Sequence, residues 1–309
     1  MSARYGQHPV NANDHGAAPG RLRLELVNRS TSSPGPAWVV TCRAKSGMIT
    51  SGRPWSPARS WAAETDTTAR SRPTVALVHG AFADSSSWND VVAQLRSAGI
   101  AVQAISNPLR GITADTAYVA SAIHQIPGPV LAVGHSYGGA IITNAARQAG
   151  NVVGLVYVAA FAPDEGEILS DIESGSTDSV LNTALLQLQY PTGPGTETAV
   201  EFAIDPAKFH DAFAADLPEE QAAIMAATQR PVAAAGFTEP NGTPGWKNLP
   251  SWAVVATGDK AAGSDVVRSM AQRAGAVITE VEGSHVIMIS QPQAVTNVIR
   301  QAIDGVTHR

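Results

Sequence analysis

The segment Gly134-His135-Ser136-Tyr137-Gly138-Gly139 constrains this chain more than any other feature of its sequence. It follows a short apolar run, residues 130–133, and precedes a stretch, residues 137–149, whose pattern predicts a helix. The segment fits G-x-S-x-G, a pattern whose glycines permit a tight turn between a strand and a helix. Such a turn presents Ser136 at the edge of a sheet, at the positive end of the following helix dipole. The sequence therefore predicts a nucleophilic serine at this position.

Apolar runs and helical stretches alternate along the chain from about residue 73 onward. We expect strands at residues 74–79, 101–105, 130–133, 153–161, 252–256 and 276–281. We expect helices at residues 113–126, 137–149, 264–274 and 292–303, and in a further stretch that ends at Gly99. Repeated strand–helix units predict an α/β fold, in which helices cover both faces of a mostly parallel sheet. Ligands bind such sheets at the carboxyl ends of the strands.

A long insertion separates the fourth predicted strand, residues 153–161, from the fifth, residues 252–256. The insertion spans roughly residues 164–249 and contains two helical stretches, 206–215 and 218–228. Because it leaves the sheet at the ligand-binding end, we expect it to form a helical cap over the site.

The charge of the chain changes sign near Pro73. Residues 1–72 hold 10 Lys and Arg against 4 Asp and Glu, a net charge of +6, whereas residues 73–309 hold 11 against 22, a net of −11. The leader is rich in Ser, Arg, Gly and Pro, and we expect it to be poorly ordered, with a short strand possible only at residues 21–26. It lacks the apolar centre of about 7–15 residues that a secretory signal needs, so we expect a cytoplasmic location. The domain proper is expected at residues 73–309.

Composition excludes several classes of protein. Hydrophobic residues make up 44% of the chain and charged residues 15%, which is unlike a disordered chain. A single cysteine, Cys42, excludes a disulfide scaffold and a cysteine zinc site. There is no apolar run near the roughly 18 residues of a membrane span, and the net charge of −5 does not indicate a nucleic-acid partner. Nothing in the sequence specifies an oligomeric state.

A serine hydroxyl is a weak nucleophile and needs a base. His285 lies in a loop just past the last predicted strand, which places it at the same sheet edge as Ser136. The other histidines of the domain are expected beside turns, in a mid-chain helix or in the cap: His79, His135, His124 and His210. We therefore predict His285 as the base.

Two aspartates follow strands and could orient the imidazole. Asp259 directly follows the strand predicted at 252–256, and Asp164 follows the strand predicted at 153–161. The order serine, aspartate, histidine along the chain matches this motif class and favours Asp259. Asp164 stays open as the alternative.

An oxyanion hole needs two backbone N–H groups aimed at one point. We predict one from Tyr137, just after the nucleophile, and one from Ala81, in the turn after the first strand, with Phe82 as the alternative donor. Phe82, Phe161 and Met288 lie near the motif ends and are predicted to form apolar walls of the substrate pocket. With no cation beside the motifs except Lys260, the pattern favours a neutral or weakly polar ester.

Four segments together resemble the α/β-hydrolase superfamily over roughly residues 73–305: His79-Gly80-Ala81, the elbow around Ser136, residues 156–164, and Gly283-Ser284-His285. Within it they resemble the branch that holds plant methyl esterases, hydroxynitrile lyases and many bacterial carboxylesterases. The resemblance implies a mostly parallel sheet with a cap. It also places the family's nucleophile, acid and base on Ser136, Asp259 and His285, and its oxyanion donors on Ala81 and Tyr137.

The activity that this resemblance implies is hydrolysis of a small-molecule carboxylic ester through an acyl-enzyme. No metal or organic cofactor is expected, because the triad needs none and no H-E-x-x-H, P-loop or dinucleotide motif is present. One alternative is a hydroxynitrile-lyase-type or other C–C lyase. The cyanide-releasing lyases of this branch carry a lysine after the histidine and a threonine in the oxyanion turn, where this chain has Val286 and Gly80. The other is a ligand sensor that keeps the pocket with little turnover.

Overall fold

A computed structural model of the protein describes residues 72–308 of the chain. The predicted basic leader, including the strand expected at 21–26, lies outside the described residues. No helix among the described residues is both long enough and apolar enough to cross a membrane.

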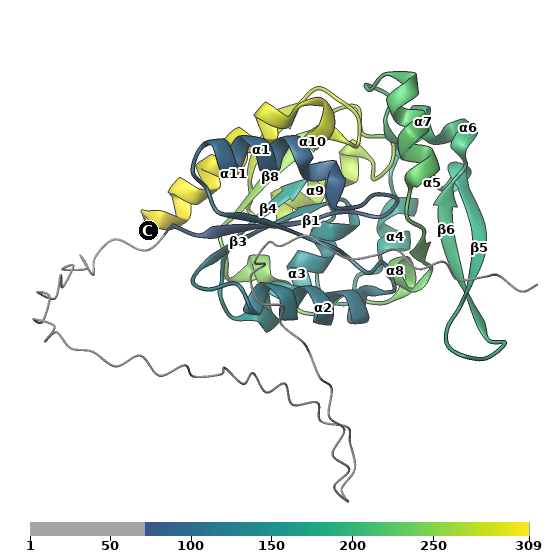
Figure 1. Ribbon diagram of the computed structural model, residues 1–309, viewed down its shortest axis with the longest axis horizontal. Coiled ribbons are helices and arrows are strands. Elements are labelled where there is room, and N and C mark those ends of the chain that lie inside the picture. Colours follow the sequence, from purple (N-terminus) through teal and green to yellow (C-terminus); the bar gives the residue numbers. More distant parts are fainter. Residues whose placement is uncertain (1–71, 309) are drawn as a thin grey trace, which may run out of the picture. The chain divides into compact units, whose positions relative to one another are not determined.

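Six parallel strands form the central sheet, in the order β2-β1-β3-β4-β8-β9 (Figure 1). They span β1 Thr74–Val78, β2 Val102–Ile105, β3 Val130–His135, β4 Val152–Val158, β8 Ser251–Ala256 and β9 Val277–Val281. Every residue of β3 and β8 is buried, as expected of parallel strands covered on both faces. The sheet confirms the predicted α/β class. The strand expected at 153–161 ends earlier, at Val158, because the next residue, Ala159, turns the chain with a φ of 44°.

Helices cover both faces of the sheet. They span η1 Ser85–Trp88, α1 Asn89–Ser97, α2 Ile112–His124, α3 Tyr137–Ala149, α9 Ser264–Arg273, α10 Ile287–Ser290 and α11 Pro292–Thr307. Figure 1 shows α1 and α11 on one side of the sheet and α2 and α3 on the other. The helix expected at 292–303 continues for one more turn to Thr307, and its buried face includes Val298, Ile299 and Ile303.

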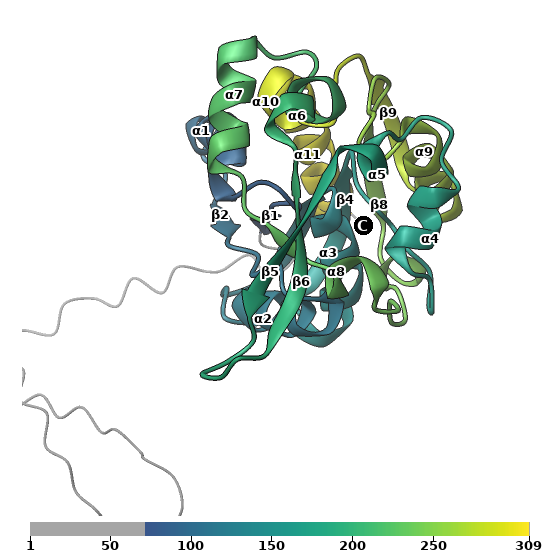
Figure 2. The same ribbon diagram turned by 90° about the vertical axis from the view of Figure 1, so that its right-hand side faces the viewer.

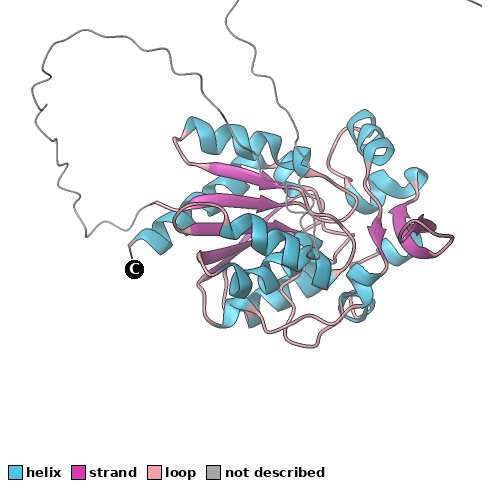
Figure 3. Cartoon of the chain, turned by 60° about the horizontal axis from the view of Figure 1, so that its bottom comes forward, coloured by secondary structure: helices cyan, strands magenta, loops and turns pink. Residues whose placement is uncertain are grey.

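The chain between β4 and β8 forms a mixed unit of helices and strands, which we call the inserted unit. Its elements are α4 Leu169–Ser174, α5 Leu181–Ala184, β5 Leu185–Pro191, β6 Thr198–Ile204, α6 Pro206–Phe213, α7 Glu219–Thr228, β7 Val232–Ala233, α8 Ala235–Thr238 and η2 Gly245–Lys247. The two helices expected here correspond to α6 and α7. The antiparallel sheet β5-β6-β7 was not expected, and its long hairpin stands out in Figure 2. Figure 3 shows the small sheet beyond the end toward which the parallel strands point.

Candidate active site

The turn from β3 into α3 places Ser136 where the sheet ends. Ser136 has φ 53° and ψ −126°, a left-handed backbone conformation that is costly for a residue with a side chain. Gly138 makes the close approach possible, because a Cβ there would lie 2.5 Å from the carbonyl oxygen of Val78 in β1. A strained backbone conformation such as that of Ser136 persists only where the surrounding structure holds it in place. The predicted strand–turn–helix setting of the serine is thus present.

Backbone hydrogen bonds hold this strained turn in place. The Ser136 N–H donates to the carbonyl of Val158 at 3.3 Å, and the Ser136 carbonyl accepts from Gly139 at 2.9 Å and from Phe161 at 3.2 Å. The serine is 6% exposed. These contacts tie the elbow to the end of the neighbouring strand β4, so the position of Ser136 is set by the sheet.

His285 lies in the loop between β9 and α10, with its ring against the elbow. Its Nδ1 atom is 2.8 Å from Oδ2 of Asp259, and both residues are 1% exposed. Its carbonyl oxygen accepts a 3.0 Å hydrogen bond from Nε2 of His135, the residue before the serine, and the two imidazole rings are 4.7 Å apart. Among residues 72–308 no hydrogen bond joins Ser136 Oγ to His285, a contact that in free enzymes often tightens only with substrate.

Both carboxylate oxygens of Asp259 have hydrogen-bond partners. Its Oδ1 atom accepts hydrogen bonds from the backbone N–H groups of Ala261 at 2.9 Å and Ala262 at 3.0 Å, which leaves Oδ2 facing His285. Asp164, the alternative acid, pairs with Lys247 at 2.5 Å on the surface of the molecule. The structure therefore places Asp259 against the imidazole and places Asp164 elsewhere.

The turn after β1 lies directly beside the nucleophile. A Cβ atom on Gly80 would be 2.7 Å from the Cβ atom of Ser136, so the two backbones are in close contact. Within the described part of the chain, the N–H groups of Ala81 and Tyr137 donate no hydrogen bond. For Tyr137 this follows from its place in the first turn of α3, where N–H groups lack partners inside the helix. Both groups are thus free for an oxyanion.

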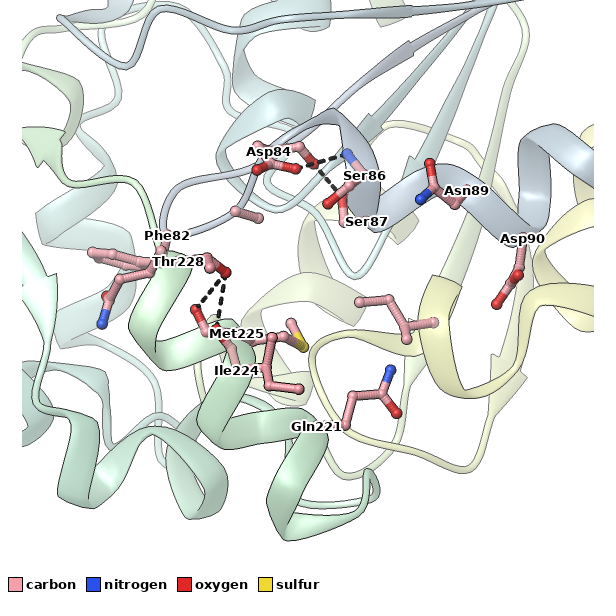
Figure 4. Close-up of a pocket in the computed structure, with 13 residues that line it drawn as sticks. Phe82, Asp84, Ser86, Ser87, Asn89, Asp90, Gln221, Ile224, Met225 and Thr228 are labelled. Atoms are coloured by element: carbon pink, nitrogen blue, oxygen red, sulfur yellow. Dashed lines mark hydrogen bonds between the residues drawn. The ribbon is translucent and has the colours of Figure 1, made fainter.

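The predicted pocket residues do not all line a cavity. Phe82 lines a cavity of about 330 Å³ between the turn after β1 and helix α7, shown in Figure 4. Its other lining residues are Ala83, Asp84, Ser86, Ser87, Asn89, Asp90, Gln221, Ile224, Met225, Thr228, Gln229 and Ile289. Phe161 and Met288 are buried in the core and are not among them, so their predicted role as walls lacks support from this cavity.

Aromatic packing connects the cavity to the base. The Phe82 ring lies 6.1 Å from that of Phe213, which in turn lies 5.0 Å from the imidazole of His285. Phe213 belongs to the inserted unit and was not predicted from the sequence, because nothing near it in the chain marks it as a neighbour of the base. Along this path two aromatic rings, those of Phe82 and Phe213, separate the cavity from the imidazole of His285.

Two further polar groups near the site, Asp115 and Asp216, were not predicted, whereas His135 was expected beside the turn. Asp115 on α2 accepts a hydrogen bond from the phenol of Tyr137, and Asp216 accepts from Ser284. Burial lowers the pKa of His135 well below its usual value, and its Nε2 atom donates to the His285 carbonyl, so the ring is neutral. Asp115 carries a weak signal in the sequence, because the helix Ile112–His124 contains no other Asp or Glu and no Lys or Arg.

Comparisons with known proteins agree with this architecture. A family model described as "Alpha/beta hydrolase family" matches residues 75–298. The "Carbendazim hydrolyzing esterase" of Nocardioides sp. (strain SG-4G) is 34% identical over 106 residues, which are 30% of this chain and 44% of that protein. The match therefore spans less than half of the length of that relative.

Two solved structures illustrate the similarity in fold. Polyneuridine aldehyde esterase has a TM-score of 0.63 at 19% identity, covering 74% of this chain and 98% of that one. Tomato methylketone synthase I, complexed with 2-tridecanone, has a TM-score of 0.61 at 20% identity, covering 76% and 99%. At these identities the likeness concerns the fold.

Proposed function

Because the chain belongs to the alpha/beta hydrolase family, we propose that it is a serine hydrolase that cleaves a small-molecule carboxylic ester. One observation carries the proposal: the buried 2.8 Å contact between His285 Nδ1 and Asp259 Oδ2, next to the elbow that presents Ser136. The local match to a protein named as an esterase supports the same class of reaction.

Acylation begins when Ser136 Oγ attacks the ester carbonyl carbon. Nε2 of His285 takes the hydroxyl proton as the C–O bond forms. Asp259 accepts a hydrogen bond from the Nδ1–H of the imidazole, which leaves Nε2 free as the base, and the charge of the carboxylate stabilises the imidazolium. The N–H groups of Ala81 and Tyr137 donate to the oxyanion of the tetrahedral intermediate.

Acylation ends when the tetrahedral intermediate collapses: the bond to the alcohol oxygen breaks, and the imidazolium gives its proton to the leaving alcohol. Deacylation repeats these steps with water as the nucleophile. Water then loses a proton to His285 and attacks the acyl-enzyme, and the carboxylic acid leaves as Ser136 regains its proton. The ring of Phe213 beside His285, with the ring of Phe82 packed against it, favours an apolar, uncharged ester as the substrate.

The residue after the base favours the hydrolase over the lyase alternative. Position 286 holds a fully buried valine, whose aliphatic side chain provides no ammonium group next to His285. Gly80, in contact with Ser136, offers no side-chain hydroxyl. A cyanide-release assay on a cyanohydrin, run beside ester turnover, is expected to show ester cleavage alone.

The test of the proposal is a panel of p-nitrophenyl esters with acyl chains of increasing length. Ser136→Ala is expected to lose at least about 10³-fold in kcat, because it removes the nucleophile. Ser97→Ala, on the exposed surface of α1, is the matched control and is expected to keep full activity. Retention of most activity by Ser136→Ala would contradict the proposed mechanism. The chain length with the highest kcat/KM measures the acyl pocket.

A further inference from the structure

A turn of the inserted unit is hydrogen-bonded to the loop that carries His285. We call residues 213–216, which begin at the last residue of α6, the cap turn, and residues 282–286 the base loop. Oδ2 of Asp216 accepts the backbone N–H of Ser284 at 2.9 Å, and Oδ1 accepts the hydroxyl of the same serine. A single carboxylate therefore holds one residue by two bonds, directly beside His285.

The carboxylate of Asp216 is ionised in this setting. Burial works to raise the pKa of Asp216, but hydrogen bonds to its carboxylate outweigh burial and lower the pKa; they come from the hydroxyl and N–H of Ser284, from the Ser290 side chain and from the backbone of Asp216 itself. Hydrogen bonds to an ionised acceptor are about twice as strong as those between neutral groups. The link between cap turn and base loop is thus a strong one.

The core anchors the two neighbours of Ser284. The carbonyl of Gly283 accepts from the N–H of Gly258 at 2.9 Å, and His285 is bound through its ring to Asp259 and through its carbonyl to His135. Ser284, between them, makes its hydrogen bonds to the cap turn. The base loop is consequently held by the sheet at two residues and by the inserted unit at the residue in the middle.

The cap turn also touches both halves of the proposed reaction centre. The Phe213 ring lies 5.0 Å from the imidazole of His285 and 6.1 Å from the ring of Phe82, the residue after the proposed oxyanion donor Ala81. A shift of the cap turn would therefore move packing around the base and around the oxyanion turn together.

We propose that Asp216 is a positioning residue for the catalytic base, which holds Ser284 so that the imidazole of His285 faces Ser136. The inference rests on the proposed function, because it assigns His285 the role of base. Without Asp216 the base loop keeps its core anchors, while Ser284 loses both bonds to the carboxylate and keeps only the 3.4 Å contact of its hydroxyl with the carbonyl of Phe213. Misplacement of a reacting group by about 1 Å can cost on the order of 10²-fold in rate.

Steady-state kinetics on the full chain test the inference with three variants. Asp216→Ala and Ser284→Ala are expected to lower kcat by about 10–100-fold and to change KM by less than about threefold, since they misplace the base without altering the pocket. Asp211→Ala removes a carboxylate that is 92% exposed from α6, the helix before Asp216, and it is expected to match the parent protein. If Asp216→Ala does not fold, Ser284→Ala carries the test, because it keeps the backbone bond.

A proton NMR measurement provides a readout that does not depend on turnover. The proton shared by His285 Nδ1 and Asp259 gives a low-field resonance, identified by its loss in Asp259→Asn. Asp216→Ala is expected to broaden or shift this resonance while the melting temperature stays close to that of Asp211→Ala. A merely structural role for Asp216 would lower the melting temperature and leave the resonance in place.

The outcomes separate this inference from the proposed function. Normal kcat and an unchanged resonance in both Asp216→Ala and Ser284→Ala, in a parent protein that cleaves esters, would overturn the positioning role alone. A parent protein that cleaves no ester but shows the perturbed resonance would overturn the proposed function and leave the positioning of His285 by Asp216 standing.

Discussion

The phenol of Tyr137 donates a 2.8 Å hydrogen bond to Oδ2 of Asp115, a fully buried carboxylate on α2. The backbone N–H groups of Arg110, at 3.0 Å, and Gly111, at 3.4 Å, donate to the same carboxylate. Burial raises the pKa of Asp115, and these hydrogen bonds oppose the rise. Because Tyr137 directly follows Ser136, this pair fixes the first turn of the helix behind the nucleophile to its neighbour α2.

Tyr137→Phe is expected to lower the free energy of unfolding by about 1–3 kcal/mol, because it leaves a buried carboxylate short of a donor. Urea denaturation measures the effect. Tyr118→Phe, at a tyrosine that is 53% exposed, is the matched control and is expected to change stability by less than about 0.5 kcal/mol. Equal stability of the two variants would show that the Tyr137–Asp115 bond makes no net contribution.

Asp259→Asn is expected to lower kcat by about 10³–10⁴-fold, because an amide no longer fixes the imidazole tautomer that leaves Nε2 as the base. Kinetics on the best p-nitrophenyl ester measure the loss. Asp164→Asn is the control: its carboxylate pairs with Lys247 at the surface, and we expect kcat within about twofold of the parent. A large loss in Asp164→Asn with a small one in Asp259→Asn would mean that the acid is wrongly assigned.

The inner strands of the central sheet could be predicted because β1, β3, β4 and β8 are short, mainly apolar runs. The sheet β5-β6-β7 was not predicted, although residues 186–190 of β5 read Leu-Gln-Leu-Gln-Tyr, the alternation of apolar and polar residues that indicates a strand. The hairpin contributes little to the core, since Leu186 and Leu188 are each 41% exposed, and it lies inside an insertion that was expected to be helical. Nor did any local signal show that the chain leaves β4 at Val158, where Ala159 adopts a positive φ.

The residues of the candidate site likewise fall into those that a local sequence pattern identifies and those that only tertiary contacts place there. Ser136 and His285 are marked by short local patterns, so the sequence identifies them directly. Their supporting partners are fixed by tertiary contacts across long separations: Asp216 lies 68 residues from Ser284 and Asp115 lies 22 residues from Tyr137. No pattern within one segment specifies such pairs, which is why the sequence indicated the proposed nucleophile and base but not the side chains bonded near them.

Gly80→Ala is expected to lower kcat by about 10–100-fold, because its Cβ atom would lie 2.7 Å from the Cβ of Ser136 and 2.9 Å from the carbonyl oxygen of His135. The elbow and the proposed oxyanion turn would have to move apart. Ester kinetics, with fluorophosphonate labelling of Ser136 as a second measure, test this. Gly193→Ala, where an added Cβ meets nothing within 4 Å, is the control. Undiminished labelling in Gly80→Ala would show that the turn can adapt.

His79 makes the stability of the fold depend on pH. Its Nδ1–H donates to the carbonyl of Gly80 at 2.9 Å, and its Nε2 accepts the N–H of Asn107 at 2.9 Å, so the neutral ring satisfies both nitrogens. Burial, together with the nearby guanidinium of Arg230, lowers the pKa of His79 from 6.5 to about 4. Between these two values the unfolded chain binds a proton at His79 that the folded protein does not. The stability from this residue is therefore complete above pH 6.5 and is lost as the pH falls toward 4.

The free energy of unfolding is expected to fall by about 2 kcal/mol from this group between pH 7 and pH 5, a range in which most carboxylates stay ionised. Urea denaturation at the two pH values measures the fall. His79→Gln removes the titrating ring while its amide oxygen can still accept from Asn107, so the variant is less stable at pH 7 but loses about 2 kcal/mol less on acidification. His124→Gln, at an exposed histidine, is expected to keep the full pH dependence of the parent. An unchanged pH dependence in His79→Gln would mean that His79 is not the group whose protonation destabilises the fold.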